Sequence, residues 1–553
     1  MSRENKTQRF NRRGFIGATS AAVALGLAGC VGNGGEEDDS PLGEGNGGNG
    51  NGNGGDTPDG EFLHVTQEVS PLEWDPIVIN DVYSNQIANM MYDGLYQYDA
   101  GLDLEPKIAA SEPEVENDGT RYIFPLREEA MFQNGDPVTA EDVEHTFLAP
   151  VEESTQNSAE VDMISDTEII DEHTLQVDLD FPFGPFATST IVRNVVPKDV
   201  RLDDPEAFNS DSPVGSGPFQ FVDWTEGEFV ELERWDDYWD DNDELANIAE
   251  IRYEPVEEDT TRVTRLETQE TDVIMGIPAQ LYESVEGISH ARIEEIQSIS
   301  YFYVAFNTNE GPTATREVRE AVEHSIDMSG FIQQQVEPAG SHVVSPVPTE
   351  LAEEWDFPLD RWADMELEQD LDRAQELLDE HAPDDWQPTI IVPPDDLRER
   401  LGEVIASSLN DLGYDAGVQR LDWGQFTETY QTGDSDEFQM YALGWSGGGD
   451  PDDFIYNLFH ESVAGEGGTQ GHFYDNPSFH DNITAARQSA DFDERRDLYI
   501  EVVDEILEEK IHMPAYGLMS SMGVNDRVGD LPAHPVSSEN PRVISSYNNT
   551  TVE

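Results

Sequence analysis

The sequence predicts a folded α/β protein whose mixed sheets are covered by helices. Short runs of alternating or β-branched residues predict strands, and they alternate along the chain with amphipathic segments that predict helices. Hydrophobic residues make up 37% of the 553 residues, which supplies enough apolar surface for a sizeable core. From residue 61 onward the composition shows no break and no internal repeat. Mixed strands and helices in this order indicate helices that pack on sheets.

The clearest strand patterns and helix patterns alternate over the whole folded part. The strand patterns are residues 62–65, 175–179, 229–232 and 299–306. The helix patterns are residues 316–325, 371–378, 401–412 and 493–507. In the first of these, Val318, Ala321 and Val322 recur at the spacing that places apolar side chains on one helix face. These elements support the fold class without giving the order of strands.

The acidity of the chain excludes some partners and predicts a salty environment. Asp and Glu number 117 against 29 Lys and Arg, which gives a net charge of −88. A polyanion such as nucleic acid would meet a field of its own sign. In molar salt the Debye length falls to about 3 Å, so the repulsion between surface acids is screened. A specific acidic function, such as calcium buffering, would concentrate the acids in one tail, but acid-rich runs occur at both 226–233 and 364–372.

The first residues resemble an export signal. Arg12 and Arg13 are followed by Phe15 and a weakly apolar stretch up to residue 29. Paired arginines before a short apolar stretch are similar to a twin-arginine signal peptide, which would span residues 1–29. The stretch is too short for a helix of about 20 apolar residues that spans a bilayer. An ordinary short membrane anchor is the alternative.

Cys30 is the only cysteine in the chain, and it follows Leu27, Ala28 and Gly29. These four residues resemble a lipobox, in which the thiol of Cys30 carries the lipid that anchors the protein to the membrane. Disulfides, cysteine nucleophiles and cysteine metal sites are excluded together. Residues 30–60 are rich in Gly, Asn and acids and predict a flexible tether. The expected location is therefore the outer face of the cytoplasmic membrane.

A glycine loop, a hairpin and an aromatic cluster follow one another between residues 214 and 239. The loop contains Gly215, Ser216 and Gly217, and the two strand patterns after it predict a hairpin. The aromatic cluster predicts a buried plug. It consists of Trp235, Tyr238 and Trp239.

This arrangement closely resembles the signature of family 5 extracellular solute-binding proteins, the receptors of ABC importers for dipeptides, oligopeptides and nickel. Residues 91–95, 122–147, 306–327, 374–378 and 423–453 resemble further family motifs in the same order. The resemblance implies a monomeric, two-lobed receptor without a cofactor or enzymatic activity, which closes around a ligand by hinge motion and then binds a membrane permease. The chain has no Gly-x-x-x-x-Gly-Lys phosphate loop, so ATP hydrolysis would belong to a separate subunit.

The resemblance also implies where the lobes lie in the sequence. Lobe I would comprise residues 61–305 with a subdomain at about 95–200, lobe II residues 306–514, and the return to lobe I residues 515–553. The chain would cross between the lobes near residues 304–307 and 513–516.

The loop at 443–453 is the strongest candidate for ligand contact. Trp445 offers a flat apolar face, and the glycines after it, including Gly447 and Gly448, allow a ligand to approach the backbone closely. In peptide-binding members an aspartate three residues after the tryptophan pairs with the ligand's ammonium group. Here that position is Gly448, which argues against recognition of a free peptide N-terminus. Asp450 would substitute if the loop is shifted, or it caps a helix that starts at Pro451.

The other candidates are fewer and weaker. Asn80, Tyr83 and the glycine loop Gly215, Ser216 and Gly217 are further candidate cleft residues. Residues 444–448 also fit Gly-x-Ser-x-Gly, so a surface serine hydrolase that uses Ser446 is one alternative function. A sensory or scaffold lipoprotein is another. The closest histidines, His460, His472 and His480, lack the spacing of metal ligands, and no metal site is expected.

Overall fold

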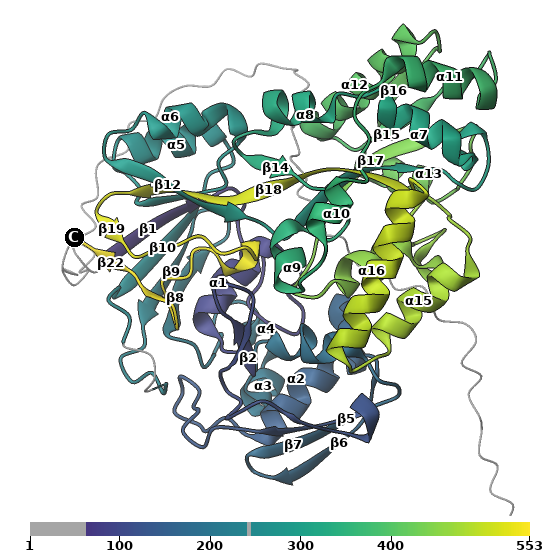
Figure 1. Cartoon of the computed structure of the whole chain (residues 1–553). Helices are drawn as coiled ribbons and strands as arrows, with labels where there is room; N and C mark the ends of the chain where they lie inside the picture. The colour runs from purple at the N-terminus through teal and green to yellow at the C-terminus, as the bar shows by residue number, and fades with distance from the viewer. Residues whose placement is uncertain (1–61, 241–244) are drawn as a thin grey trace, which may run out of the picture.

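The computed structural model describes residues 62–240 and 245–553 (Figure 1). The predicted export signal with Arg12 and Arg13, the lipidation site Cys30 and the tether lie outside the described residues. No helix of the described part is long and apolar enough to cross a membrane.

One mixed sheet runs through the whole molecule. Its strand order is β16-β15-β17-β13-β18-β11-β1-β10-β9-β8, and β12 and β14 also pair with β18. The strands are β1 (Phe62–Gln67), β8 (Phe219–Thr225), β9 (Phe229–Arg234), β10 (Glu250–Pro255), β11 (Val273–Met275), β12 (Ala291–Gln297), β13 (Ser300–Phe306), β14 (Gly340–His342), β15 (Thr389–Val392), β16 (Gly417–Arg420), β17 (Met440–Ser446) and β18 (His512–Asn525). We call the part with β1 and β8–β12 lobe I and the part with β13 and β15–β17 lobe II.

Strand β18 belongs to both lobes. Its first residues pair with β13 of lobe II, where His512 lies opposite Ala305, and its last residues pair with β11 of lobe I, where Val524 lies opposite Val273. Strand β12 pairs with residues 519–525 of β18, and the next strand, β13, pairs along its full length with β17. The predicted lobe boundary between residues 305 and 306 therefore falls inside β13.

A second sheet forms a separate layer below lobe I (Figure 1). It has the order β4-β5-β7-β6 and is covered by helix α2. Its own buried cluster includes Trp235 and Trp239, so the predicted aromatic plug is confirmed. Strands β2 and β3 form a hairpin beside this sheet. The bounds are β2 (Tyr96–Tyr98), β3 (Leu104–Pro106), β4 (Glu114–Glu116), β5 (Arg121–Pro125), β6 (Ile164–Asp171) and β7 (Thr174–Leu179).

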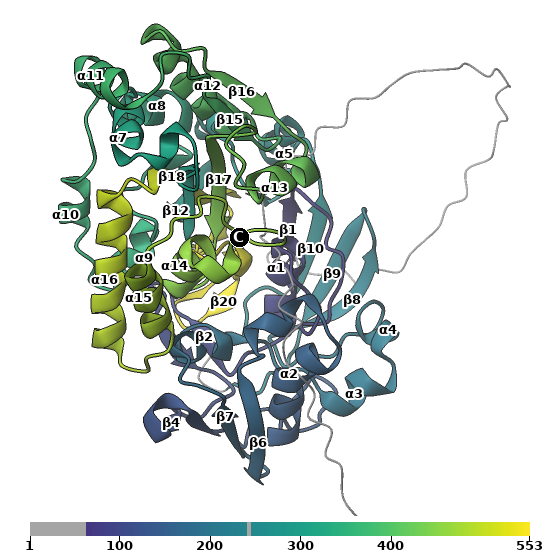
Figure 2. The same ribbon diagram turned by 90° about the vertical axis from the view of Figure 1, so that its right-hand side faces the viewer.

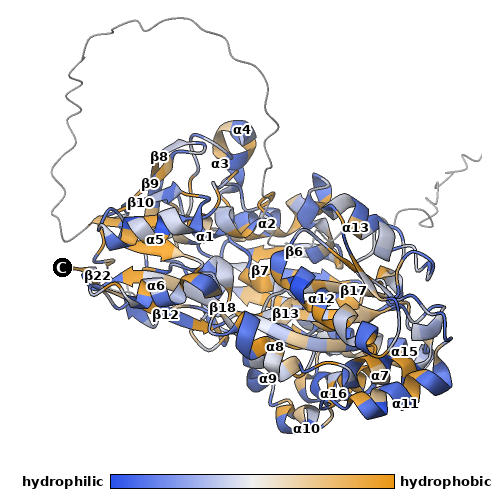
Figure 3. Ribbon diagram, turned by 90° about the horizontal axis from the view of Figure 1, so that it is seen from above, coloured by the Kyte–Doolittle hydropathy of each residue, from blue (hydrophilic) through white to orange (hydrophobic). Residues whose placement is uncertain are grey.

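Helices cover the sheets of both lobes, and the strands near the middle are more hydrophobic than the helices around them (Figure 3). Lobe I and its subdomain carry α1 (Val82–Met91), α2 (Ala140–Glu152), α3 (Lys198–Asp203), α4 (Pro205–Phe208), α5 (Asp259–Glu267) and α6 (Tyr282–Glu286). Lobe II carries α7 (Arg316–His324), α8 (Met328–Phe331), α9 (Thr349–Glu354), α10 (Leu359–Ala363), α11 (Leu371–His381), α12 (Asp396–Asp411), α13 (Trp423–Tyr430), α14 (Asp452–Phe459), α15 (Pro477–Arg487) and α16 (Phe492–Glu508). All four predicted helices and all four predicted strands are confirmed, with shifted ends.

The chain returns to lobe I within β18 and stays there. Short strands β19 (Val528–Gly529) and β22 (Thr551–Val552) pair with each other, as do β20 (Ile544–Ser545) and β21 (Asn548–Asn549). Side chains of this segment belong to the buried cluster around β1, β9 and β10. On the other side of the molecule, α15 and α16 of lobe II lie beside β2 and the subdomain (Figure 2). The two lobes therefore touch through the subdomain as well as through the shared sheet.

Candidate functional site

The motifs that identify the chain in sequence form a buried network in lobe I. The Asp93 carboxylate accepts hydrogen bonds from Tyr238 Oη at 3.1 Å and from Trp239 Nε1 at 3.2 Å. The Ser216 hydroxyl accepts the N–H of Asp93 at 3.1 Å, and the Ser216 carbonyl accepts Trp239 Nε1 at 2.9 Å. Burial raises the pKa of Asp93 to about 6. This network joins three separate sequence motifs and holds lobe I together.

The glycine loop packs directly on the end of helix α1. The Gly217 N–H donates to the Met91 carbonyl at 2.8 Å, and a Cβ on Gly215 would lie 1.9 Å from the same oxygen. Only glycine allows two backbones to approach this closely. Gly215, Ser216 and Gly217 are all buried. We therefore leave these three predicted cleft residues out of the candidate site, because their close approach is to protein backbone.

Trp445 lies at the end of β17 and mostly faces the lobe II core. It is 8% exposed, belongs to the large buried cluster of lobe II and lies opposite Tyr301 in the ladder. The next residue, Ser446, is exposed. The chain then leaves the sheet as the β17–α14 loop, residues 447–451.

The β17–α14 loop contacts lobe I through its glycines. The Gly449 N–H donates to Tyr98 Oη at 3.3 Å, and a Cβ on Gly449 would lie 2.8 Å from the Tyr98 ring. A Cβ on Gly448 would lie 3.9 Å from both Tyr98 and Ser189. A Cβ on Gly447 would instead lie 2.9 Å from the ring of Phe454 in α14. The loop therefore lies at the contact between the lobes, and its glycines make room for lobe I side chains.

Asp450 anchors the loop from inside. It is fully buried, and Arg495 Nη2 donates to both carboxylate oxygens at 2.7 and 2.9 Å. Thr188 of lobe I also donates its hydroxyl to this carboxylate. The Asp452 N–H donates to Asp450 Oδ1 at 2.8 Å, but α14 begins at Asp452 with Pro451 at the N-cap. The sequence predicts Asp450 as the N-cap, whereas the structure has the next residue, Pro451, at that position. The Asp450 carboxylate is already bound by protein groups.

The three acids at the start of α14 differ in their partners. Asp450 pairs with Arg495, and Asp452 accepts from Arg487 Nη1 at 2.6 Å. The half-buried Asp453 accepts only the Gly448 N–H, at 2.7 Å, and none of the ion pairs in the described residues includes it. Burial, followed by the Asp450 charge, raises the pKa of Asp453 to about 7. Among the residues that the structure describes, Asp453 is therefore a carboxylate without a cationic partner at the contact between the lobes.

Asn80 and Tyr83 lie at the start of α1 in lobe I, both half-buried. Asn80 donates its side-chain amide to Gln156, and Tyr83 Oη donates to Glu68 Oε2 at 3.1 Å. Burial and the Glu68 charge raise the pKa of Tyr83. No hydrogen bond of the described part joins either residue to the β17–α14 loop. Their contact with a ligand stays a prediction.

The structure offers no support for chemistry at Ser446 or at the histidines. Within residues 62–240 and 245–553, no hydrogen bond joins Ser446 to a histidine, and no group of three His, Cys, Asp or Glu could hold a metal ion. His472 is fully buried and its Nε2 lies 2.9 Å from the Leu458 carbonyl. His460 lies 3.0 Å from the Thr484 hydroxyl and His480 3.0 Å from the Tyr474 carbonyl.

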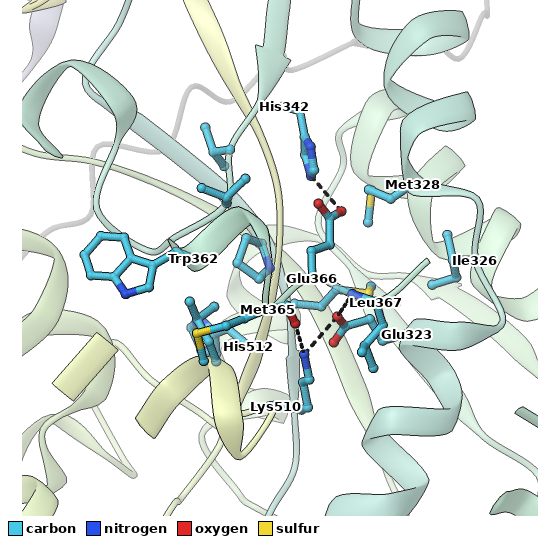
Figure 4. Close-up of a pocket in the computed structure, with 15 residues that line it drawn as sticks. Glu323, Ile326, Met328, His342, Trp362, Met365, Glu366, Leu367, Lys510 and His512 are labelled. Atoms are coloured by element: carbon cyan, nitrogen blue, oxygen red, sulfur yellow. Dashed lines mark hydrogen bonds and ion pairs between the residues drawn. The ribbon is translucent and has the colours of Figure 1, made fainter. Parts of the chain in front are cut away.

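Two cavities lie away from this loop. One, in lobe II, has a volume of about 20 Å³, lies beside the buried Lys510–Glu323 ion pair of 3.0 Å and is bordered by His342, Glu366 and Trp362 (Figure 4). That volume holds a single water molecule. The other is an open pocket of about 440 Å³ between His64 and Arg527, where the described chain begins. Neither cavity adjoins the glycines that the sequence singled out.

A substitution at Gly449 tests how tightly the lobes contact each other. Gly449→Ala places a Cβ 2.8 Å from Tyr98, so we expect the free energy of unfolding to fall by about 1–3 kcal/mol through overpacking. Thermal unfolding in molar salt measures the change. The control is Gly417→Ala, because a Cβ at Gly417 meets nothing within 4 Å. Equal free energies of unfolding for the two variants would show that the contact between Gly449 and Tyr98 accommodates an extra methyl group without loss of stability.

Comparison with known proteins agrees with this architecture. The model for bacterial extracellular solute-binding proteins, family 5, matches residues 103–466. Protein XP55 of Streptomyces lividans is 27% identical over 443 residues, which cover 76% of this chain and 77% of that protein. Two solved structures share the fold. HbpA2 from Haemophilus parasuis has a TM-score of 0.76 and 22% identity and covers 89% of this chain and 100% of that one. DppA from Helicobacter pylori in complex with the peptide STSA has a TM-score of 0.71 and 22% identity and covers 89% and 98%. The chain belongs to the family 5 extracellular solute-binding proteins.

Proposed function

We propose that this protein captures a small cationic solute, with a peptide that has a free amino terminus as the first candidate, and delivers it to an ABC permease. The lipid on Cys30 would hold the receptor at the outer face of the membrane after twin-arginine export, and a separate subunit would hydrolyse ATP. The receptor works as a monomer and carries out no chemistry. Support for a peptide comes from the family and from the H. pylori relative, whose structure contains one.

Asp453 is the observation that carries the cationic ligand. Its neighbours Asp450 and Asp452 both have arginine partners, whereas Asp453 lies beside Gly448 without one. A carboxylate kept half-buried and unpaired is costly, and a ligand cation that pairs with it removes the cost. Asp453 would then supply the carboxylate that the sequence lacks at Gly448. Trp445, Gly447 and Gly448 would form the wall around the bound cation.

The pairing of the strands supports different hinge positions from those that the sequence predicts. Strand β12 pairs with β18 and the following β13 pairs with β17, so the first crossing lies at Ser298 and Ile299. The second lies within β18 near Gly517, between the part that pairs with β13 and the part that pairs with β11. Closure by a hinge needs only a few residues that change their backbone angles.

The rival functions have less support. A serine hydrolase needs a base within hydrogen-bond reach of Ser446, and the described residues show no histidine bonded to it. An esterase assay of the native protein and of Ser446→Ala decides this directly. A sensory or scaffold lipoprotein would have no transported solute in its cleft. The absence of any solute that co-purifies with the protein would therefore favour this alternative.

Mass spectrometry of the protein purified in molar salt tests the proposed ligand class. We expect peptides or other amines to co-purify. The Asp453→Asn variant should then bind the peptide Ser-Thr-Ser-Ala at least about tenfold more weakly, which corresponds to about 1.4 kcal/mol. Isothermal titration calorimetry measures the affinity. N-acetylation of the peptide should weaken binding to the native protein and leave binding to Asp453→Asn unchanged.

Binding should also depend on pH through Asp453. Because the pKa of Asp453 is about 7, a cationic ligand meets a protonated carboxyl below this pH and a carboxylate above it. Affinity should rise up to about tenfold per pH unit below 7 and reach a maximum between about pH 7 and 8. It should fall at higher pH, because the α-amino group of the peptide, with a pKa of about 8, then loses its proton. The raised pKa also means that the folded state loses stability as pH rises between about 4 and 7, so Asp453→Asn should stabilise the ligand-free protein at alkaline pH.

The matched control is Asp481→Asn, which removes an exposed carboxylate of α15 in the same lobe. If Asp453→Asn and Asp481→Asn bind the peptide equally well, Asp453 does not contact the ligand. If only neutral sugars co-purify, the proposed cationic ligand is wrong, but the protein is still a solute-binding protein of family 5.

A further inference from the structure

The tip of the β2–β3 hairpin, residues 99–103, has a fixed shape. Asp99 Oδ1 accepts the N–H of Gly101 at 2.7 Å and the N–H of Asp103 at 3.0 Å. His534 of the C-terminal return lies with Nε2 2.9 Å from the Asp99 carbonyl. The tip is therefore fixed by hydrogen bonds within itself and by the contact of Asp99 with His534, so we expect it to move with lobe I as one body.

Leu102, at the end of this tip, is buried in the other lobe. It is 6% exposed and belongs to a hydrophobic cluster whose other buried members all lie between residues 299 and 511. Its φ is 73°, in the left-handed region that a leucine rarely adopts because its Cβ crowds the backbone. Such strain persists where the surroundings compensate for it. Here the Asp99 hydrogen bonds to Gly101 and Asp103 and the apolar contact of Leu102 with lobe II both compensate for the strain, and the apolar contact exists only while the lobes are together.

An acidic side chain from each lobe lies at this contact. Asp103 follows Leu102 on lobe I, and Glu354 at the end of α9 in lobe II lies within hydrogen-bond reach of the Asp103 side chain. Burial raises the pKa of Glu354, and the charge of Asp103, a side-chain hydrogen bond with Asp103 and the charges of Asp99 and Asp356 raise it further. Both Asp103 and Glu354 are exposed, so dissolved ions reach them. The same contact thus combines two opposing interactions. The apolar contact of Leu102 with lobe II does not depend on charge, whereas the repulsion between Asp103 and Glu354 is screened by salt.

We propose that the hairpin tip is a salt-dependent latch, in which Leu102 holds the lobes closed and the Asp103–Glu354 repulsion opens them when salt is removed. At 0.1 M ionic strength the Debye length is about 10 Å, and at 1 M it is about 3 Å. Facing carboxylates therefore repel each other in dilute solution and hardly at all in molar salt. The latch rests on the proposed receptor function, in which closure around the solute is the active state. The latch would make solute capture depend on the salt concentration outside the cell.

Fluorescence energy transfer between the lobes of the ligand-free protein tests the latch. Cys30→Ser removes the native thiol, and Glu226→Cys with Asp411→Cys places one label on each lobe. As salt is lowered, the closed fraction of the parent protein should fall. Glu354→Gln should shift the midpoint at least twofold toward lower salt, whereas Glu353→Gln, on the same helix, should leave it unchanged. Only salt concentrations that preserve the near-ultraviolet circular dichroism are compared.

The apolar part of the latch is tested by Leu102→Ala. This variant should lower the closed fraction at least threefold at every salt concentration, and the exposed Leu202→Ala in the same lobe should not. Identical behaviour of Glu354→Gln and Glu353→Gln, or of Leu102→Ala and Leu202→Ala, would overturn the proposal. The measurement needs no ligand, so a failed latch leaves peptide binding by Asp453 intact, and a failed peptide titration leaves the latch in place.

Discussion

Transfer of the protein from molar salt into dilute buffer is expected to unfold it. The net charge of −88 cannot be balanced internally, because only 29 basic residues serve 117 acids. Some basic residues already serve two acids: Arg252 pairs with both Glu231 and Glu254. At an ionic strength of about 0.01 M the Debye length reaches about 30 Å, so acids across a whole lobe repel one another.

Near-ultraviolet circular dichroism during stepwise dialysis measures this unfolding. We expect the aromatic signal to disappear in dilute buffer and to return when salt is restored. Salts of different cations at equal ionic strength provide the control, since screening alone should make them similar. A protein that keeps its signal in dilute buffer would show that the acidity is not an adaptation to salt.

Arg495→Met is expected to be the most destabilising single substitution, lowering the free energy of unfolding by about 3–5 kcal/mol. Arg495 is buried and donates to both oxygens of the fully buried Asp450. Its removal leaves a buried carboxylate with the Thr188 hydroxyl and a backbone N–H as its remaining partners. Because the pair also fixes the β17–α14 loop, peptide affinity should fall together with stability.

Arg496→Met is the matched control for this experiment. Arg496 is the next residue of α16 and pairs with the exposed carboxylates of Asp493 and Asp497. Surface pairs of this kind contribute about 0–1 kcal/mol, so the control should unfold close to the native protein. Equal midpoints for the two variants in thermal unfolding would contradict a structural role for the Asp450–Arg495 pair.

The sequence predicts the family and most elements of the fold because those properties have local patterns. Alternation, amphipathic spacing and the ordered motifs all lie within short windows of the chain. The same motifs are less specific about the site. Gly215 and Gly217 indicate a close backbone approach, but a pattern of glycines does not tell whether a ligand or the Met91 carbonyl comes close.

Asp453 could not be identified from sequence for a related reason. It is one of three nearby acids in a chain with 117 of them. Its difference from Asp450 and Asp452 depends on Arg495 and Arg487, which lie more than 30 residues further along the chain. Leu102 could not be identified from sequence either, because its burial arises from contact with residues of the other lobe that lie about 200 residues or more further along the chain.

The course of strand β18 also determines the order in which the chain completes its lobes during synthesis. The strands of lobe II lie between residues 300 and 516, so this lobe has its sheet before the last segment of the chain is made. Lobe I, although it begins first, also buries Val528, Val543 and Val552 from the segment after β18 in its core. Domains that form from a continuous stretch of chain fold as they emerge. The N-terminal lobe is therefore the last to be finished, and a truncated chain would leave its core open.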